Sequence, residues 1–376
     1  MQNKECDIII TYCWNRVGYN IVRSLASHGL KVWCADTSAK NICSLSKYCT
    51  GSFVYPDYTK DEPAFIECLK QKVAELKPKM LLPTHDESIV VMRHRNEFPD
   101  DLLIPYTNEE LLTSLANKAQ STAAAKKVGI PVPKVYHSVD DIKKYPVVFK
   151  SVFGNSAKEV YYPKTKEELL KLMDKYKNQE SMLEEWIGGT DYCVDCIRWN
   201  GFWKATVYHA LVTKTEGGGT TTQREIVNVP ELEKYAKMLL ESVDYNGVCG
   251  LDFRYDPETG VVAYIETNTR FTGGLATSVC AGFDIPWIIW KLAVDGKYED
   301  PINVRIGTKT KWILGDIITL VGRTLALRWD SKEMKQVFTF SGFDAFDDFF
   351  YDDKIAILGE FSYYFGKLVK NGKLNP

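Results

Sequence analysis

Residues Ile265–Phe271 read IETNTRF, a stretch in which an apolar strand ends in alternating polar residues. Side chains of a strand alternate between its two faces, so Glu266, Asn268 and Arg270 are expected on one face. The preceding segment, GLDFRYDPETGVVAY, has the composition of a hairpin whose turn is formed by residues 256–260. The sequence therefore predicts a row of polar side chains that project from one face of a hairpin.

The pairing of this hairpin determines which polar side chains meet. With Tyr255 opposite Val261, even-numbered positions pair with even-numbered ones, and Asp252 falls on the same face as Glu266. Carboxylate and amide oxygens would then converge, and such a group suits Mg²⁺, which keeps several waters and shares phosphate oxygens. The alternative is a solvated sheet face on which Arg270 forms a salt bridge. Spacing alone leaves both interpretations open.

Composition and charge describe a soluble globular protein. A chain of 376 residues, 45% hydrophobic and 26% charged, is long enough for two or three packed domains. Nucleic-acid-binding proteins usually have an excess of positive charge, whereas this chain has a net charge of −2. No nucleic-acid partner is therefore expected. The N-terminal apolar run is too short for a signal-peptide core, and the expected location is the cytoplasm.

The ten cysteines are expected to stay reduced, because the chain shows no secretory signal. Cys193 and Cys196 form a nominal CxxC pair within a strand-like run. An offset of three places their side chains on opposite faces of a strand, which argues against a redox pair or a zinc clip. Burial as small apolar residues is the expected role.

The first hundred residues alternate strand and helix signals. Apolar runs at 7–13, 31–36 and 79–84 are typical of buried strands, and this alternation predicts a parallel, doubly wound sheet. Ligands of such sheets bind beyond the carboxyl ends of the strands, where loops 11–18 and 84–87 lie. Loop 11–18 has no GxGxxG, which argues against an NAD-dependent oxidoreductase. Loop 84–87 either caps the next helix or faces a substrate.

The next block predicts a small α+β unit. Residues 108–129 are rich in good helix formers and are expected to be one long helical region that stops at Gly129 and Pro131. Two strands then flank the loop GNSAK at 154–158, and Lys150 lies inside the apolar strand before it. A lysine at that place is either a snorkelling edge residue or a cation directed at a buried anion.

Five segments in this order resemble the ATP-grasp superfamily, especially its carbamoyl-phosphate-synthetase and D-alanine ligase branches. They are NKAQSTAAAKKVGIPVP, FKSVFGNSAKEV, EEWIGGTD, GLDFRYD and IETNTR. The resemblance spans roughly residues 1–295. It implies an α/β and α+β fold with four parts: a Rossmann-like pre-ATP-grasp domain (1–105), a small lid subdomain (106–183), a large subdomain with the metal site (184–299) and an aromatic-rich C-terminal extension (300–376).

The resemblance also implies roles for particular residues. Those expected to bind ATP through its phosphates, a covering glycine loop, the adenine hinge or the ribose are Lys118, Lys150, Ser156, Glu184, Glu185, Trp186, Ile187 and Asp191. Those that match the ligands of Mg²⁺, with Mn²⁺ as a substitute metal, are Asp252, Glu266 and Asn268. Arg270 would then stabilise an acyl phosphate or the oxyanion formed from it.

One position departs from the pattern of these ligases. Many of them carry an arginine two residues before the first metal aspartate, where this chain has Gly250. Oxyanion stabilisation is then expected from Arg270 or Arg224, and Lys214 or Arg224, both in the segment KTEGGGTTTQREIV, is expected to reach the γ-phosphate. That segment, 214–227, is expected to be a long Gly/Thr loop, either closing over the site or lying on the surface.

The predicted function is an ATP-dependent carboxylate–amine ligase that produces ADP through an acyl phosphate. Positioning and charge neutralisation by Mg²⁺, the two lysines and Arg270 would suffice for this chemistry. The alternatives are a non-catalytic nucleotide-binding regulatory protein and an NAD-dependent oxidoreductase. The expected partners are a small-molecule carboxylate and an amine, and homodimer formation is left open.

The C-terminal extension is expected to pack on the core, because a disordered segment rarely contains so many aromatic residues. Its apolar stretch at 312–327 falls short of the ~20 residues that span a bilayer, so a buried or docking helix is expected there. A subunit interface and a membrane contact are the alternatives. The acidic cluster Asp344, Asp347, Asp348, Asp352 and Asp353 argues against a membrane, since an anionic bilayer would repel it.

Overall fold

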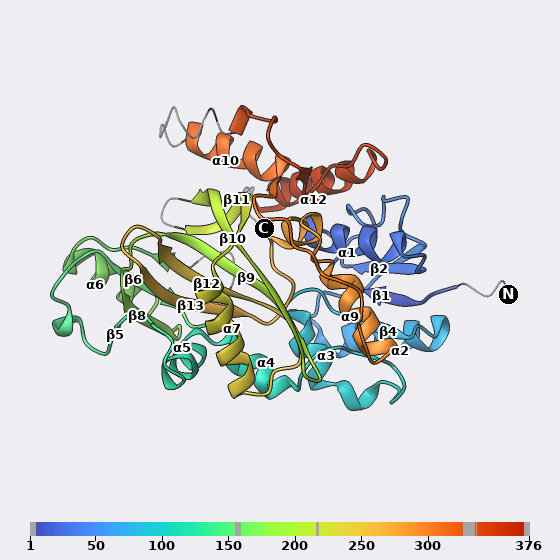
Figure 1. Cartoon of the computed structure of the whole chain (residues 1–376), viewed down its shortest axis with the longest axis horizontal. Coiled ribbons are helices and arrows are strands. Elements are labelled where there is room, and N and C mark those ends of the chain that lie inside the picture. The colour runs from blue at the N-terminus through green and yellow to red at the C-terminus, as the bar shows by residue number, and fades with distance from the viewer. Residues whose placement is uncertain (1–4, 155–158, 216–217, 326–334, 336, 372–376) are drawn as a thin grey trace.

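The computed structural model describes residues 5–154, 159–215, 218–325, 335 and 337–371. These residues form three sheets with helices packed around them. Figure 1 shows the N-terminal sheet at one end of the molecule and the smallest antiparallel sheet at the other.

The N-terminal sheet is parallel and has the strand order β3-β2-β1-β4. Its elements are β1 (Ile8–Ile10), α1 (Arg16–Ser27), β2 (Val32–Asp36), β3 (Gly51–Val54), α2 (Glu62–Leu76), β4 (Met80–Leu82), α3 (Glu87–Arg93) and the short 3-10 helix η1 (Arg95–Glu97). The sequence predicted β1, β2 and β4 but missed β3. That edge strand lacks a continuous apolar run, because its residues alternate between half-buried and exposed.

The lid sheet has the order β5-β8-β6-β7 and is antiparallel. Its elements, with the helices that precede it, are α4 (Glu109–Ala116), α5 (Lys118–Lys127), β5 (Val135–Tyr136), η2 (Val139–Asp141), β6 (Val147–Ser151), β7 (Val160–Tyr161), α6 (Lys166–Lys175) and β8 (Ser181–Glu185). The expectation of one long helix over 108–129 is wrong. Asn117 has an extended backbone and its side chain accepts from Gln120 N, so it caps a second helix there.

The large sheet has the order β13-β12-β9-β10-β11-β14-β15. Its first part contains β9 (Thr190–Trp199), β10 (Phe202–Thr215), β11 (Gly218–Val227), α7 (Pro230–Ser242), β12 (Gly247–Asp256), β13 (Val261–Asn268), α8 (Leu275–Cys280) and α9 (Ile285–Val294). The expectation of a long loop over 214–227 is wrong, because β10 and β11 pair as antiparallel strands up to Thr215 and Gly218.

The C-terminal extension continues this sheet and covers it. It contains β14 (Lys309–Lys311), α10 (Ile313–Leu325), β15 (Ala345–Phe346) and α12 (Ala356–Asn371). Strand β14 pairs with β11, and β15 pairs with β14. Figure 1 shows α10 and α12 as a layer over β10, β11 and α1. The expectation that this segment packs on the core is confirmed.

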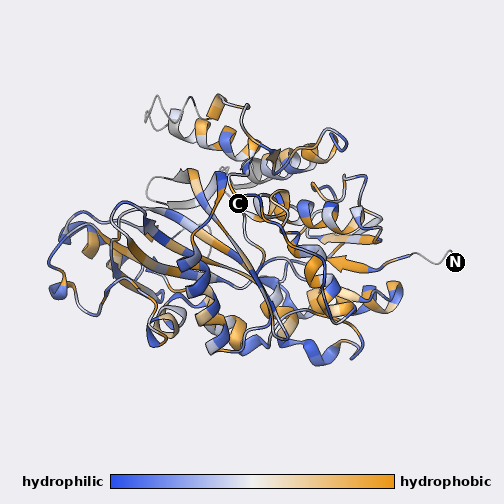
Figure 2. Cartoon of the chain, in the orientation of Figure 1, coloured by the Kyte–Doolittle hydropathy of each residue, from blue (hydrophilic) through white to orange (hydrophobic). Residues whose placement is uncertain are grey.

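One large apolar core joins the N-terminal and the large sheet, and the lid sheet has a smaller core of its own. Ile8, Ile9 and Ile10 are fully buried, as expected for a parallel strand covered on both faces, and Figure 2 shows the apolar character of β1. All ten cysteines are free thiols. Cys193 and Cys196 belong to different apolar clusters, which confirms that they lie on opposite faces.

Among the described residues, no helix is both long and apolar enough to cross a bilayer.

Candidate nucleotide and metal site

The β12–β13 hairpin closes more tightly than the sequence indicated. Asp256 pairs with Val261, so the predicted pairing of Tyr255 with Val261 is wrong. The turn is completed by Gly260, whose amide donates to the Asp256 carbonyl at 2.8 Å. Gly260 has a φ of 72°, a value that favours glycine because a side chain would be strained there.

A β-bulge corrects the register before the polar row begins. Phe253 pairs with Tyr264 and Asp252 pairs with Glu266, which leaves Ile265 as an extra residue on β13. Bulges re-aim side chains, and this one places Asp252 directly opposite Glu266. The predicted meeting of these two carboxylates is therefore correct, although the predicted pairing that led to it is not.

Asp252, Glu266 and Asn268 form the candidate metal site. Asn268 Nδ2 donates to Asp252 Oδ2 at 2.9 Å. Burial and the charge of Glu266 raise the pKa of Asp252 to about 8. Burial also favours the neutral form of Glu266, but Lys118 and Lys150 outweigh it and lower the pKa of Glu266. Two adjacent carboxylates in such a setting are stabilised by a divalent cation.

The side chains of Asp252, Glu266 and Asn268 would supply only part of the coordination of Mg²⁺. Within the ranges that the structure describes, no group of three or more His, Cys, Asp or Glu side chains is arranged as a metal cage. Two carboxylates with one amide are instead suited to an ion that takes its remaining ligands from water and phosphate. The residues present therefore fit a nucleotide-bound Mg²⁺ rather than a structural metal.

Two lysines from the lid side approach this hairpin. Lys118, the first residue of α5, places its Nζ 3.2 Å from Glu266 Oε2 and 2.6 Å from the Gly154 carbonyl. Lys150 on β6 lies 2.7 Å from Glu184 Oε2, and both side chains are at most 3% exposed. The interpretation of Lys150 as a snorkelling edge residue is therefore wrong, because it faces a buried anion.

The predicted adenine and ribose residues lie at the end of β8 and the start of β9. Glu184 is buried against Lys150, whereas Glu185 is exposed and Trp186 is 41% exposed. Ile187 follows them and is half-buried. The five predicted hinge and ribose positions thus divide into one buried carboxylate that holds a lysine and four more accessible residues.

Asp191, the predicted ribose acid, has a partner that the sequence analysis missed. Arg254 Nη1 lies 2.6 Å from Asp191 Oδ1, and Arg254 Nη2 also donates to the Gly189 carbonyl. Arg254 and Asp191 are directly opposite each other on β12 and β9. Opposite charges at paired strand positions attract each other. The ion pair could therefore have been predicted if the pairing of β9 with β12 had been known.

Arg270 faces the loops of the N-terminal sheet. Its Nε lies 3.0 Å from Asp86 Oδ1, and its side chain is 11% exposed. Asp86 precedes α3 without a capping hydrogen bond from its side chain, so the helix-cap interpretation of loop 84–87 is wrong. Tyr12 stacks on His85 with ring centroids 4.2 Å apart, which brings loop 11–18 to the same place.

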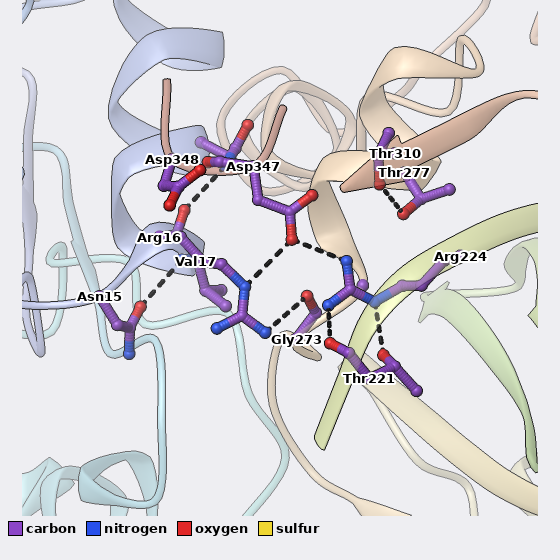
Figure 3. Close-up of polar contacts among 12 residues, drawn as sticks. Asn15, Arg16, Val17, Thr221, Arg224, Gly273, Thr277, Thr310, Asp347 and Asp348 are labelled. Atoms are coloured by element: carbon purple, nitrogen blue, oxygen red, sulfur yellow. Dashed lines mark hydrogen bonds and ion pairs between the residues drawn. The ribbon is translucent and has the colours of Figure 1, made fainter. Parts of the chain in front are cut away.

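Three predicted residues lie elsewhere or outside the described part. Arg224 is fully buried, where its Nη1 contacts Asp347 Oδ2 at 2.7 Å and its Nε contacts Thr221 Oγ1 at 2.6 Å (Figure 3). Ser156 falls within 155–158, outside the described residues. Lys214 lies in β10, and its side chain is likewise outside the described part.

Gly250 has a steric explanation. A Cβ at this position would fall 2.0 Å from Thr272 Cγ2 and 3.2 Å from Cys193 Sγ. Thr272 is buried, and its hydroxyl donates to Asp195 Oδ1 at 2.6 Å. The arginine that many such ligases carry here cannot be accommodated in this packing.

Arg16 is a further residue near the site that the sequence did not indicate. Its Nη2 donates to the Gly273 carbonyl at 3.3 Å, three residues beyond Arg270, and its Nε contacts Asp347 Oδ2 at 3.1 Å (Figure 3). Its guanidinium also lies 3.8 Å from the centroid of the Trp312 ring. No local pattern could have found it, because its partners Gly273, Trp312 and Asp347 are all distant in the sequence.

Strand β6 of the antiparallel lid sheet and helix α5 each supply a buried lysine, and a larger sheet carries an Asp/Glu/Asn group, an arrangement that resembles the ATP-grasp fold. Comparison with known proteins agrees: residues 177–315 match a family described as ATP-grasp in the biosynthetic pathway with Ter operon. This part of the chain is similar to that ATP-grasp family.

Individual relatives are distant. The chain is 22% identical over 258 residues to a D-aspartate ligase of Enterococcus faecium, and the match covers 58% of this chain and 60% of that enzyme. An N5-carboxyaminoimidazole ribonucleotide synthetase in its ADP complex superposes with a TM-score of 0.67 at 16% identity, covering 87% of this chain and 86% of that one. A biotin carboxylase of Campylobacter jejuni gives 0.66 at 15%, covering 82% and 75%.

Proposed function

We propose that the protein is an ATP-dependent carboxylate–amine ligase. A substrate carboxylate would attack the γ-phosphate of ATP, giving an acyl phosphate and ADP. An amine would then attack the acyl carbon, and phosphate would leave. The proposal is supported by two similar proteins that are named as ligases, a D-aspartate ligase and an L-amino acid ligase from Bacillus licheniformis.

The observation that carries the proposal is the joint placement of Lys118 and Lys150 beside Glu266. Cations from the lid side and the anionic group of β12–β13 meet across the two sheets. Such a junction is suited to the phosphates of a nucleotide, which require cations and a carboxylate-held metal together. A protein that bound only a neutral ligand would have no use for this charge arrangement.

Roles follow for the residues around this junction. Lys118 and Lys150 would bind the phosphates, and Asp252, Glu266 and Asn268 would hold Mg²⁺. The metal, when bound, neutralises charge on the phosphates. Arg270, held by Asp86, would stabilise the negative charge that develops on the acyl group.

The loop after β1 argues against a dinucleotide-dependent oxidoreductase. Its backbone amides are engaged within the protein: Tyr12 N donates to Tyr55 Oη, Cys13 N to Ala35 O, Trp14 N to Asp36 Oδ2, and Val17 N and Gly18 N to Asn15 Oδ1. A dinucleotide pyrophosphate needs free amides at this turn. The five donors named here are already used.

The test is phosphate release from ATP and Mg²⁺ in the presence of pooled carboxylates and amines. Release that requires both pools supports the ligase. A non-catalytic nucleotide-binding protein would instead show a rise in thermal stability with ATP·Mg²⁺ and no turnover with any pool. Stabilisation by NADH but not by ATP·Mg²⁺ would overturn the proposal.

A further inference from the structure

The lid contains a cavity of its own, which we call the lid cavity. It has a volume of about 700 Å³ and is bounded by α5, β5, β6, β8 and the end of α6. Figure 1 shows these elements together at one end of the molecule. Within the described part of the chain, the residues that line it include none of those assigned above to ATP or to the metal. The lid cavity has the size of a small-molecule site and is separate from the nucleotide site.

The lid cavity shares two strands and a helix with the nucleotide site. Phe149 and Leu183, directly opposite each other on β6 and β8, line it and are at most 8% exposed. Lys150 and Glu184 follow them in the chain and project to the other face of the lid sheet, because strand neighbours alternate between faces. Helix α5, which begins with Lys118, forms one wall. A molecule bound here would therefore lie against the elements that carry both lysines.

The wall formed by α5 contains a buried hydroxyl group. Thr122 is 3% exposed, and its Oγ1 makes no hydrogen bond within the described part of the chain. Leaving a buried hydroxyl unpaired is unfavourable, so such a group normally has a partner. Thr122 lines the lid cavity, so a bound molecule can supply that partner. Ala119 and Ala123 line the same wall and leave room for it, because their side chains are single methyl groups.

Lys126 lies one helical turn beyond Thr122, on the same face of α5. It is exposed, lines the lid cavity, and forms no ion pair with any carboxylate that the structure describes. Lys127 shares the last turn of the helix, where cations are favourable, but it does not line the cavity. A hydroxyl and an ammonium group one turn apart are suited to a carboxylate, which accepts hydrogen bonds from both.

The remaining lining is mainly apolar, and no aspartate or glutamate belongs to it. Three carboxylates lie beside the lid cavity, and each is held by a lining residue: Asp174 by Lys177, Glu159 by the Gln179 amide, and Asp141 by the Ser138 backbone N–H. These contacts involve the residues that follow α6 and precede η2. The lining lysine that is left without a carboxylate among the described residues is therefore on α5, beside Thr122.

We propose that the lid cavity binds a small carboxylate with an apolar body, whose carboxylate group accepts hydrogen bonds from Thr122 Oγ1 and Lys126 Nζ. The apolar body packs on Phe149 and Leu183. A neutral apolar molecule would leave Lys126 unused, and a cation would be repelled by it. The site differs from that of the substrate carboxylate, because Arg270 is not part of its lining. The carboxylate and ATP are therefore expected to bind at the same time.

The experiment is an NMR titration of the full chain with phenylacetate, hydrocinnamate and isocaproate, observed on the ligand. At least one of them is expected to bind ~10-fold or more tightly than its own amide, which keeps the apolar body and lacks the charge. Saturating ATP·Mg²⁺ should not displace it. Absence of binding by all three carboxylates overturns the proposal. Competitive displacement by ATP·Mg²⁺ also overturns it, because the cavity would then belong to the nucleotide site.

Two substitutions test the residues of the site. Lys126→Met should weaken binding of the carboxylate ~10-fold and leave binding of the amide unchanged, because only the contact with the charge is lost. Thr122→Val should also weaken binding, while thermal stability stays equal or rises, because an unpaired buried hydroxyl is removed.

The matched control is Lys127→Met, which removes the adjacent exposed lysine outside the cavity and should bind like the wild type. Thermal unfolding shows whether each variant is folded. Equal affinity of folded Lys126→Met and the wild type for the carboxylate overturns the proposal, because the carboxylate would then bind elsewhere. The test does not depend on ligase activity.

Discussion

Arg16 and Asp347 form a buried ion pair of 3.1 Å, although 331 positions separate them in the sequence. The same carboxylate oxygen of Asp347 lies 2.7 Å from Arg224 Nη1. One residue of the C-terminal extension thereby holds the first turn of α1 to strand β11 (Figure 3). The extension is part of the folded core, because it neutralises one buried arginine of helix α1 and another of strand β11.

Asp347→Asn should destabilise the protein by about 3–5 kcal/mol, because it leaves two buried guanidinium groups without their counter-ion. Urea unfolding measures the change. Asp100→Asn, at an exposed aspartate, is the control and should change stability by less than ~0.5 kcal/mol. Equal stability of the two variants, or a stable and active core after proteolytic removal of 300–376, would contradict this role.

Lys150→Met should abolish nucleotide binding and also destabilise the fold by about 3 kcal/mol, because Glu184 would keep a buried and unpaired charge. Adding Glu184→Gln should restore much of the stability but not the binding. Urea unfolding and titration with ATP·Mg²⁺ separate the two effects. Tight ATP binding by the double variant would show that Lys150 does not contact the phosphates.

Asp252→Asn and Glu266→Gln should each lower Mg²⁺-dependent ATP consumption ~100-fold or more while the fold stays intact, because each weakens a ligand of the metal. Phosphate release and circular dichroism measure the two properties. Glu258→Gln, in the exposed hairpin turn, is the matched control and should behave like the wild type. Near wild-type turnover in the Asp252→Asn, Glu266→Gln double variant would exclude this metal site.

Gly250→Ala should cost about 1–3 kcal/mol of stability, because the new Cβ collides with Thr272 Cγ2. Adding Thr272→Ser removes that methyl group, keeps the hydroxyl bonded to Asp195, and should recover most of the loss. Gly322→Ala, where nothing lies within 4 Å of the new Cβ, is the control and should be neutral or slightly stabilising. Failure of Thr272→Ser to rescue would refute the steric explanation.

Glu87 makes stability depend on pH. Burial raises its pKa from an ordinary 4.5 to about 7, although Thr11 Oγ1 and Thr84 N donate to Oε1. Between these values the unfolded chain releases a proton that the folded chain keeps, so the free energy of unfolding falls as pH rises. The full effect is at most about 3 kcal/mol.

Glu87→Gln removes this titration and should flatten the decline of stability between pH 4.5 and 7 relative to the wild type. Urea unfolding at a series of pH values measures the free energy of unfolding of both proteins. The contributions of the other buried acids cancel in the difference, because both proteins contain these residues. Glu110→Gln, at an exposed glutamate of α4, should keep the wild-type slope. Parallel curves for Glu87→Gln and the wild type would mean that Glu87 ionises normally.

The sequence alone determined the elements that local pattern controls. Apolar runs revealed β1, β2 and β4, and the alternation in IETNTRF placed Glu266 and Asn268 on one face. The order of the ATP-grasp segments indicated the fold. These features are readable because periodicity and motif spacing depend on neighbours in the chain.

The tertiary structure decided everything that depends on contacts between distant segments. The bulge at Ile265 sets the Asp252–Glu266 register, which hairpin spacing could not specify. Arg224, expected near the γ-phosphate, is instead neutralised by Asp347, which is fully buried. A buried charge takes whichever partner the packing brings within reach, and that partner leaves no trace in the local sequence.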